Sequence, residues 1–140
     1  MRGRYLIAGL LIALVSAAGA TAALQKGSHS LHATLAGKAE TPKGDPDGSG
    51  TAEVKFNGTQ VCWQIHVAKV GTITASHIHK GKPGVAGPVV VPFGAAFKSK
   101  GCIAASASLI AAILKNPSAY YVNVHNAKYP GGALRGQLHS

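Results

Sequence analysis

Acidic residues are scarce in this sequence of 140 residues. There are four of them against fourteen Lys and Arg, and the formal net charge at pH 7 is +10. The four are Glu40, Asp45, Asp47 and Glu53, so no carboxylate side chain follows residue 53. Glycoside hydrolysis and two-metal phosphoryl transfer need carboxylates that converge on one substrate. The sequence therefore argues against both kinds of chemistry.

Cysteine is equally sparse, with Cys62 and Cys102 as the two in the chain. This number excludes a disulfide-dense miniprotein and a four-cysteine zinc site. Neither residue belongs to a C-x-x-C pair. We expect the two to form a disulfide in an oxidising compartment. The alternative is that one of them is a metal-binding or reactive cysteine.

Long apolar runs are also lacking, except for one at the amino terminus. Two arginines precede an apolar stretch at 5–15, and small residues with two A-x-A sites fill 16–23. This order is typical of a secretory signal peptide. The alternative, an uncleaved anchor helix, needs a longer run of about 20 residues. We predict a signal peptide over 1–22, a single β domain over 23–140, a secreted or periplasmic location and no membrane span after cleavage.

The net charge stays positive after cleavage of the predicted signal peptide. Loss of Arg2 and Arg4 leaves twelve bases and four acids, a charge of +8. The lysines are scattered, with no basic stripe and little aromatic interleaving, so the pattern does not support nucleic-acid binding. It favours attraction to an anionic partner in the cell envelope or outside the cell. The alternative is that the charge serves solubility alone.

The remaining sequence alternates as β-strands do. At 51–56 and 59–67, apolar residues fall on one face and polar residues on the other, and Asn57-Gly58 between them favours a type I′ hairpin. Asn116-Pro117 would end the single expected helix. Further strands and this helix are expected at 31–39 (an edge strand), 73–79, 88–93, 106–114 (the helix), 120–125 and 133–139. The pattern predicts an all-β fold, an antiparallel sandwich or Greek-key-like barrel with one short helix.

Histidine is plentiful, with seven in the chain. His77 and His79 are two positions apart in an expected strand, so both project from the same face. A later strand places Tyr121, Asn123 and His125 on one face. If the two strands are neighbours, the three imidazoles converge on a site for Cu or Zn. Carboxylates that commonly support metal-bound histidine are nearly absent, and the alternative is that these histidines bond loop carbonyls and serve the fold.

These motifs resemble the CHRD domain, the repeated module of chordin that also occurs alone in exported bacterial proteins. The resemblance runs from about Leu31 to Leu138, and Lys80 stands where Arg is common. The matching stretches are 77–81 (His-Ile-His-Lys-Gly) with Gly84, 87–90 (Gly-Pro-Val-Val), 120–126 (Tyr-Tyr-Val-Asn-Val-His-Asn) and 131–138 with Arg135-Gly136-Gln137. The paired cysteines also look like the stand-alone bacterial form. Chordin antagonises bone morphogenetic proteins, ligands that a bacterium lacks, so the resemblance implies fold and export rather than that activity.

A second, weaker similarity is to Cu/Zn superoxide dismutase. That family is a β-barrel with an H-x-H strand pair and a distant third histidine on copper, and an arginine guards the site. In this sequence His77, His79, His125 and Arg135 would take those parts. The departures are that no Asp follows residue 53 to complete a zinc subsite and that no bridging histidine lies between His79 and His125.

We interpret the chain as an exported binding or structural module of the cell envelope, rather than an enzyme, with a candidate histidine metal site. The alternative is a copper protein with redox or dismutase-like chemistry at the three histidines. The expected functional surface also includes Tyr121, Asn123 and Arg135, polar residues on the same strand faces. For Asn123 and Arg135 the alternative is that they satisfy buried backbone groups.

Overall fold

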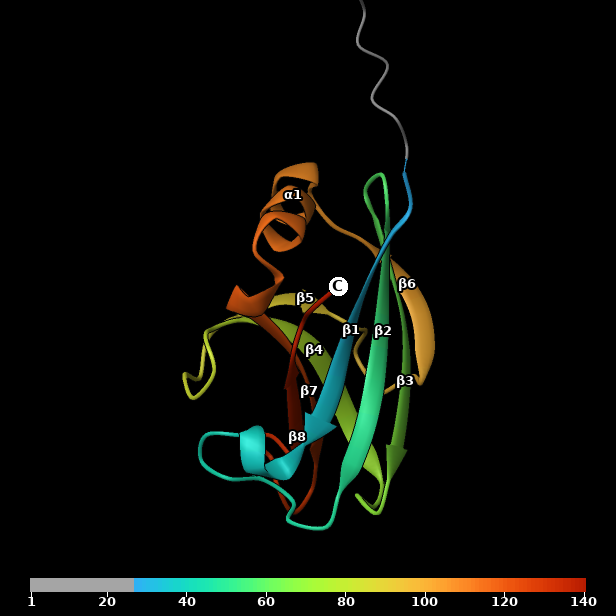
Figure 1. Cartoon of the computed structure of the whole chain (residues 1–140). Coiled ribbons are helices and arrows are strands. Elements are labelled where there is room, and N and C mark those ends of the chain that lie inside the picture. Colours follow the sequence, from blue (N-terminus) through green and yellow to red (C-terminus); the bar gives the residue numbers. More distant parts are fainter. Residues whose placement is uncertain (1–26) are drawn as a thin grey trace, which may run out of the picture.

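The computed structural model describes residues 27–140 (Figure 1). The segment 1–22, predicted as a signal peptide, lies outside the described residues. The elements follow in the order β1 (His29–Ala36), η1 (Gly37–Ala39), β2 (Ser49–Asn57), β3 (Gln60–Ala68), β4 (Ile73–Lys80), β5 (Val89–Pro92), β6 (Lys100–Ala104), α1 (Ala107–Lys115), η2 (Pro117–Ala119), β7 (Tyr120–Asn126) and β8 (Leu134–Gln137). This composition confirms the predicted all-β fold with one short helix. Within 27–140, no helix is long and apolar enough to cross a membrane.

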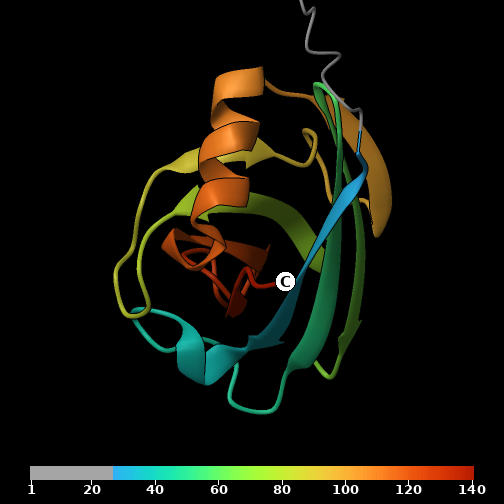
Figure 2. The same ribbon diagram turned by 45° about the horizontal axis from the view of Figure 1, so that its top comes forward.

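The eight strands form one antiparallel sheet in the order β5-β4-β7-β8-β1-β2-β3-β6. The sheet curls around a single interior, and α1 lies over one end of it (Figures 1 and 2). The expectation that the first strand is an edge strand was wrong, because β1 lies between β8 and β2. The carboxyl-terminal chain returns to β1 through the pairing of Ala36 with Arg135 and the bridge between His32 and His139. The edges are β5 and β6 instead.

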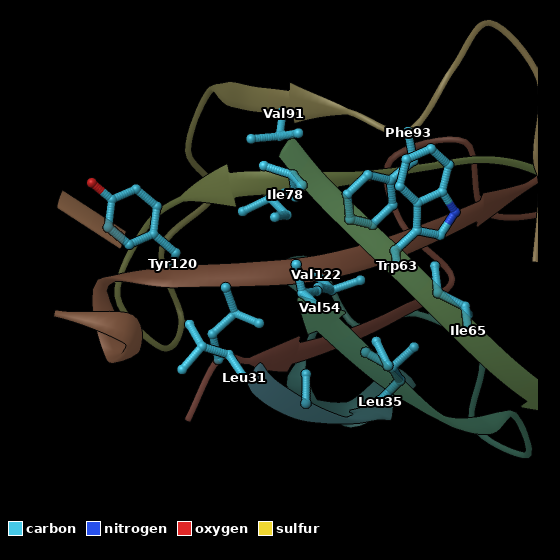
Figure 3. Packing of buried hydrophobic residues seen from close by; sticks show 14 of the residues in the cluster. Leu31, Leu35, Val54, Trp63, Ile65, Ile78, Val91, Phe93, Tyr120 and Val122 are labelled. Atoms are coloured by element: carbon cyan, nitrogen blue, oxygen red, sulfur yellow. The ribbon is translucent and has the colours of Figure 1, made fainter. Parts of the chain in front are cut away.

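The chain between the two edge strands links the sides of the curled sheet. The backbone N–H of Phe93 donates to the carbonyl of Ser76 in β4, and the N–H of Ile65 in β3 donates to the carbonyl of Ser99. Trp63 stacks on Phe93 with ring centroids 4.5 Å apart (Figure 3). These contacts nearly close the curled sheet into a barrel.

The β2–β3 hairpin forms as predicted, but its turn is shifted by one residue. Asn57 pairs with Gln60, so the two loop residues are Gly58 and Thr59. Of these two, Gly58 alone has a positive φ, 60°. Glycine at the first loop position is the arrangement of a type II′ turn rather than the expected type I′ turn. The pairing moves by two residues in total, an even number. The same alternate residues therefore face inward, and the apolar faces of both strands still point to the core.

The core consists of the inward-facing alternate residues of the strands (Figure 3), and one face of α1 packs against them. Val54 and Ile78 are completely buried, and Ile113 of α1 is as well. The helix begins where the side chain of Ser106 accepts a hydrogen bond from the Leu109 N–H at 3.2 Å, a favourable N-cap. The predicted helix is confirmed to within one residue at each end.

Strand β6 was not predicted, because Lys100–Ala104 contains a glycine and alternates weakly. The reason for that glycine is tertiary: a Cβ at Gly101 would lie 2.6 Å from the ring of Trp63. Cys102 in β6 pairs directly with Cys62 in β3, and the expected disulfide joins them. A disulfide is typical of a protein in an oxidising compartment.

Candidate metal centre

The outer face of β4, β7 and β8 carries the polar residues that the strand patterns placed together. The register pairs His77 with Asn123 and His79 with Tyr121. On the other side of β7, Asn123 pairs with Arg135. The residues between these positions point into the core. The H-x-H pair and the Tyr-x-Asn-x-His motif therefore share one face of neighbouring strands.

The structure brings the three candidate ligands together. One ring nitrogen from each of His77, His79 and His125 lies within 4.8 Å of the other two. His77 Nδ1 and His125 Nε2 are 3.2 Å apart. Neighbouring ligands with bonds of about 2.0–2.1 Å to one ion lie about 3.0–3.4 Å apart. This pair already has the spacing of a metal site, and a nitrogen of the third ring lies within 4.8 Å of both.

Backbone carbonyls fix which nitrogen of two rings faces the centre. His79 Nδ1 lies 2.8 Å from the carbonyl of Gly87, and His125 Nδ1 lies 2.9 Å from the carbonyl of Pro130. Because a carbonyl can only accept, each Nδ1 donates, and each neutral ring keeps a lone pair on Nε2. His79 Nε2 is buried without a hydrogen-bond partner among the described residues. A buried acceptor of this kind costs free energy unless a ligand occupies it.

Burial also keeps the imidazoles of His77 and His79 in the neutral form that binds metal. Desolvation, followed by the charges of His125 and His79, lowers the pKa of His77 from 6.5 to about 4. Desolvation likewise lowers the pKa of His79. Imidazole binds metal as the neutral base. At neutral pH both rings can therefore bind an ion without first losing a proton.

Tyr121, Asn123 and Arg135 lie beside the histidines but beneath other segments. They are 3%, 2% and 1% exposed, which argues against an exposed contact surface made of these residues. The guanidinium of Arg135 donates to the carbonyls of Val85 and Lys82 at 2.8 and 2.6 Å. Arg135 thus holds the loop between β4 and β5 over the outer face.

That loop in turn holds a candidate ligand. The N–H of Gly87 donates to Tyr121 Oη at 3.1 Å, and the carbonyl of Gly87 accepts from His79. A Cβ at this position would lie only 1.7 Å from the carbonyl oxygen of Lys80. Glycine is therefore required where the loop passes over β4.

Sequence reasoning missed Glu40, a carboxylate within the site. It is 6% exposed and accepts a hydrogen bond from Asn123 Nδ2 at 3.3 Å. It comes from the segment after β1, which is joined to the residue before β8 by the bond from the Asp45 N–H to the Ala133 carbonyl. Burial raises the pKa of Glu40, while the Asn123 hydrogen bond and the Arg135 charge partly oppose this rise. A separation of 83 residues leaves no local pattern, and the sole signal was its membership among only four acids.

One known protein family matches most of the chain. The family model of the CHRD domain matches residues 31–138. The chain belongs to the CHRD domain family. No curated protein and no solved structure matches it. The matched span contains the three histidines, Asn123 and Glu40, so the whole candidate centre lies within the CHRD domain.

Proposed function

We propose that this CHRD domain is an exported binding module whose three-histidine centre holds Zn(II) or Cu(II). The observation that carries the proposal is the convergence of His77, His79 and His125, with Nε2 of His79 buried and without a hydrogen-bond partner within 27–140. Imidazole suits both ions. The module would bind the metal through neutral nitrogen ligands on two neighbouring strands, a rigid support for a site.

The alternative, that the histidines serve the fold by bonding loop carbonyls, leaves the buried Nε2 of His79 without a hydrogen-bond partner among the described residues. His79 and His125 do bond the carbonyls of Gly87 and Pro130, but each uses Nδ1 alone. Metal-bound histidine usually donates its other ring N–H to a carbonyl or carboxylate, which orients the ring. The same two bonds therefore also support the metal interpretation.

The geometry gives the dismutase-like alternative no support from Arg135. In that alternative the guanidinium would guard the metal. Its Nη1 and Nη2 instead donate to the carbonyls of Val85 and Lys82, and Nη2 also donates to Gln137 Oε1 at 2.9 Å. We therefore favour metal binding over redox catalysis as the function of the centre.

Export is supported by the pattern of residues 1–22 and by the Cys62–Cys102 disulfide. The signal peptide pattern targets the secretory route, and disulfides persist in oxidising compartments. The excess of lysine favours an anionic partner in the envelope or outside the cell.

A metal titration of the purified domain tests the proposed function. We expect calorimetry with Zn(II) and Cu(II) to show one equivalent bound by the wild-type domain, and His79→Ala to lose this binding. His66→Ala is the matched control, because His66 is exposed on β3 and bonds Gln64 instead. Absence of binding to the wild type, or equal binding by His79→Ala shown to be folded by circular dichroism, would overturn the proposal.

A further inference from the structure

We propose that Asn123 Oδ1 is the fourth ligand of the three-histidine centre and that Glu40 is the positioning residue that turns this oxygen toward the ion. This inference rests on the proposed function, because it concerns the same centre. Asn123 Oδ1 lies 3.0 Å from His125 Nε2. That distance, like the 3.2 Å from His77 Nδ1 to the same nitrogen, is the spacing of neighbouring ligands around one ion.

The metal-free centre contains a conflict that a cation resolves. His125 Nδ1 donates to the Pro130 carbonyl, so in the neutral form of the ring, the form that binds metal, Nε2 carries a lone pair. Asn123 Oδ1, 3.0 Å away, carries lone pairs as well. Two acceptors at this distance repel one another, and a donated hydrogen from His77 Nδ1 satisfies only the nitrogen. An ion between the three side chains would bond to all of them at once.

Glu40 determines which end of the amide faces this point. Asn123 Nδ2 donates to Glu40 Oε1, and a carboxylate only accepts, so Oδ1 is turned toward the histidines. Glu40 is held in place by its surroundings, since a Cβ added at Gly132 would lie 2.4 Å from its Oε1. The buried carboxylate is thus fixed on one side of the amide and the histidines on the other.

A fourth protein ligand changes what the centre does. Structural zinc sites are closed by four protein ligands, whereas catalytic sites keep one position open for water or substrate. Three imidazole nitrogens and the amide oxygen of Asn123 would close a four-coordinate site. The centre would hold its ion as part of the module and would not present it to a substrate.

Glu40→Gln tests the inference with little change in volume. A glutamine can donate its own NH2 to Asn123 Oδ1, which turns the amide and presents its NH2 group to the ion. We expect Zn(II) affinity to fall about 10–100-fold, the usual effect of losing a supporting residue behind a ligand. We also expect the Cu(II) electron paramagnetic resonance spectrum to change, because an oxygen ligand is lost. Glu53→Gln is the control, since that carboxylate lies on β2 and pairs with Lys55.

The double variant Glu40→Gln with Asn123→Asp provides a rescue and a second route should the single variant fail to fold. An aspartate presents oxygen whichever way it turns, and the formal charge of the pair returns to that of the wild type. We expect affinity and spectrum to recover together. Failure of this recovery in the folded double variant would overturn the inference.

The outcomes separate the inference from the proposed function. If the wild-type domain binds no Zn(II) or Cu(II), the proposed function fails. If the wild type binds and Glu40→Gln keeps its affinity and spectrum, only the assignment of Glu40 as the positioning residue is overturned. A loss of affinity with an unchanged Cu(II) spectrum also overturns it, because Glu40 would then act through its charge alone.

Discussion

The guanidinium carbon of Arg135 lies 3.4 Å from the centroid of the Tyr121 ring. His79 stacks on the same ring, with centroids 4.9 Å apart and planes 9° from parallel. Tyr121 stands on β7 between the strands of the other two residues, so its ring connects a buried cation to a candidate metal ligand. Contacts of these two kinds each contribute about 0.5–2 kcal/mol. They orient the imidazole of His79 before any ion is present.

Arg135→Lys is expected to destabilise the domain by about 2–4 kcal/mol. Lysine lacks the planar fork that stacks on Tyr121 and bonds two carbonyls at once, and each hydrogen bond from a charged donor contributes about 1.5–3 kcal/mol. Urea unfolding of the chelator-treated protein measures the loss. Lys80→Met, on the exposed end of β4, is the control and should stay within about 0.5 kcal/mol of wild type. Equal stability of Arg135→Lys and wild type would show that the guanidinium does not anchor the loop between β4 and β5.

Replacing both cysteines by serine is expected to lower the free energy of unfolding by about 3–4 kcal/mol. The disulfide joins residues 40 positions apart, and closing a loop of that length removes about this much chain entropy from the unfolded state. Denaturant unfolding of Cys62→Ser with Cys102→Ser, compared with the oxidised wild type, provides the measurement. Since β6 pairs with β3 through five residue pairs around this bond, a loss close to zero would mean that the ladder alone holds the edge strand.

The alternation of polar and apolar residues was enough to predict most strands and the common face of His77, His79 and His125. It could not predict Glu40, because the contact with Asn123 depends on a segment far away in the sequence folding over β8. It left two alternatives open for Arg135, a functional surface or bonds to backbone groups, and the guanidinium donates to two loop carbonyls. Strand parity states which face of the sheet a residue occupies, but not whether a loop covers that face, and two segments cover this one.

The stability of the metal-free domain is expected to fall as the pH drops from about 6.5 to about 4. The pKa of His77 is lowered from 6.5 to about 4 in the folded state, so the unfolded chain binds more protons across this window and unfolding becomes easier. The lowered pKa of His79 acts in the same direction. The raised pKa of Glu40 acts in the opposite direction above pH 4.5. The pH dependence of the free energy of unfolding of the wild type is therefore a sum of opposing contributions. A comparison of the wild type with a variant at His77 is more informative.

The His77→Gln variant isolates the contribution of the His77 imidazole to the pH dependence of stability. Urea unfolding in the presence of a chelator, from about pH 7 to about pH 4.5, should show a shallower pH dependence for this variant than for the wild type. The charged groups that face His77, namely His79 and His125, are the same in both proteins. Parallel curves for the two proteins would contradict the lowered pKa of His77.

Gly132→Ala and Gly131→Ala form a matched pair of variants that tests the packing around Glu40. Gly132 has a φ of 143°, and a Cβ there would lie 2.4 Å from Glu40 Oε1, whereas a Cβ at Gly131 meets nothing within 4 Å. We expect Gly132→Ala to cost about 1–3 kcal/mol by overpacking and backbone strain and Gly131→Ala to stay within about 0.5 kcal/mol of wild type.

The same pair separates the position of Glu40 from its charge. Because Gly132→Ala displaces the carboxylate without removing it, Zn(II) affinity should fall in this variant and not in Gly131→Ala. Urea unfolding and metal titration of both proteins provide the two measurements. A Gly132→Ala domain that loses stability but keeps wild-type affinity would show that the ion does not depend on where Glu40 sits. A loss of both would tie the segment after β1 to the centre on β4 and β7, through Asn123 and the amide oxygen that it turns toward the histidines.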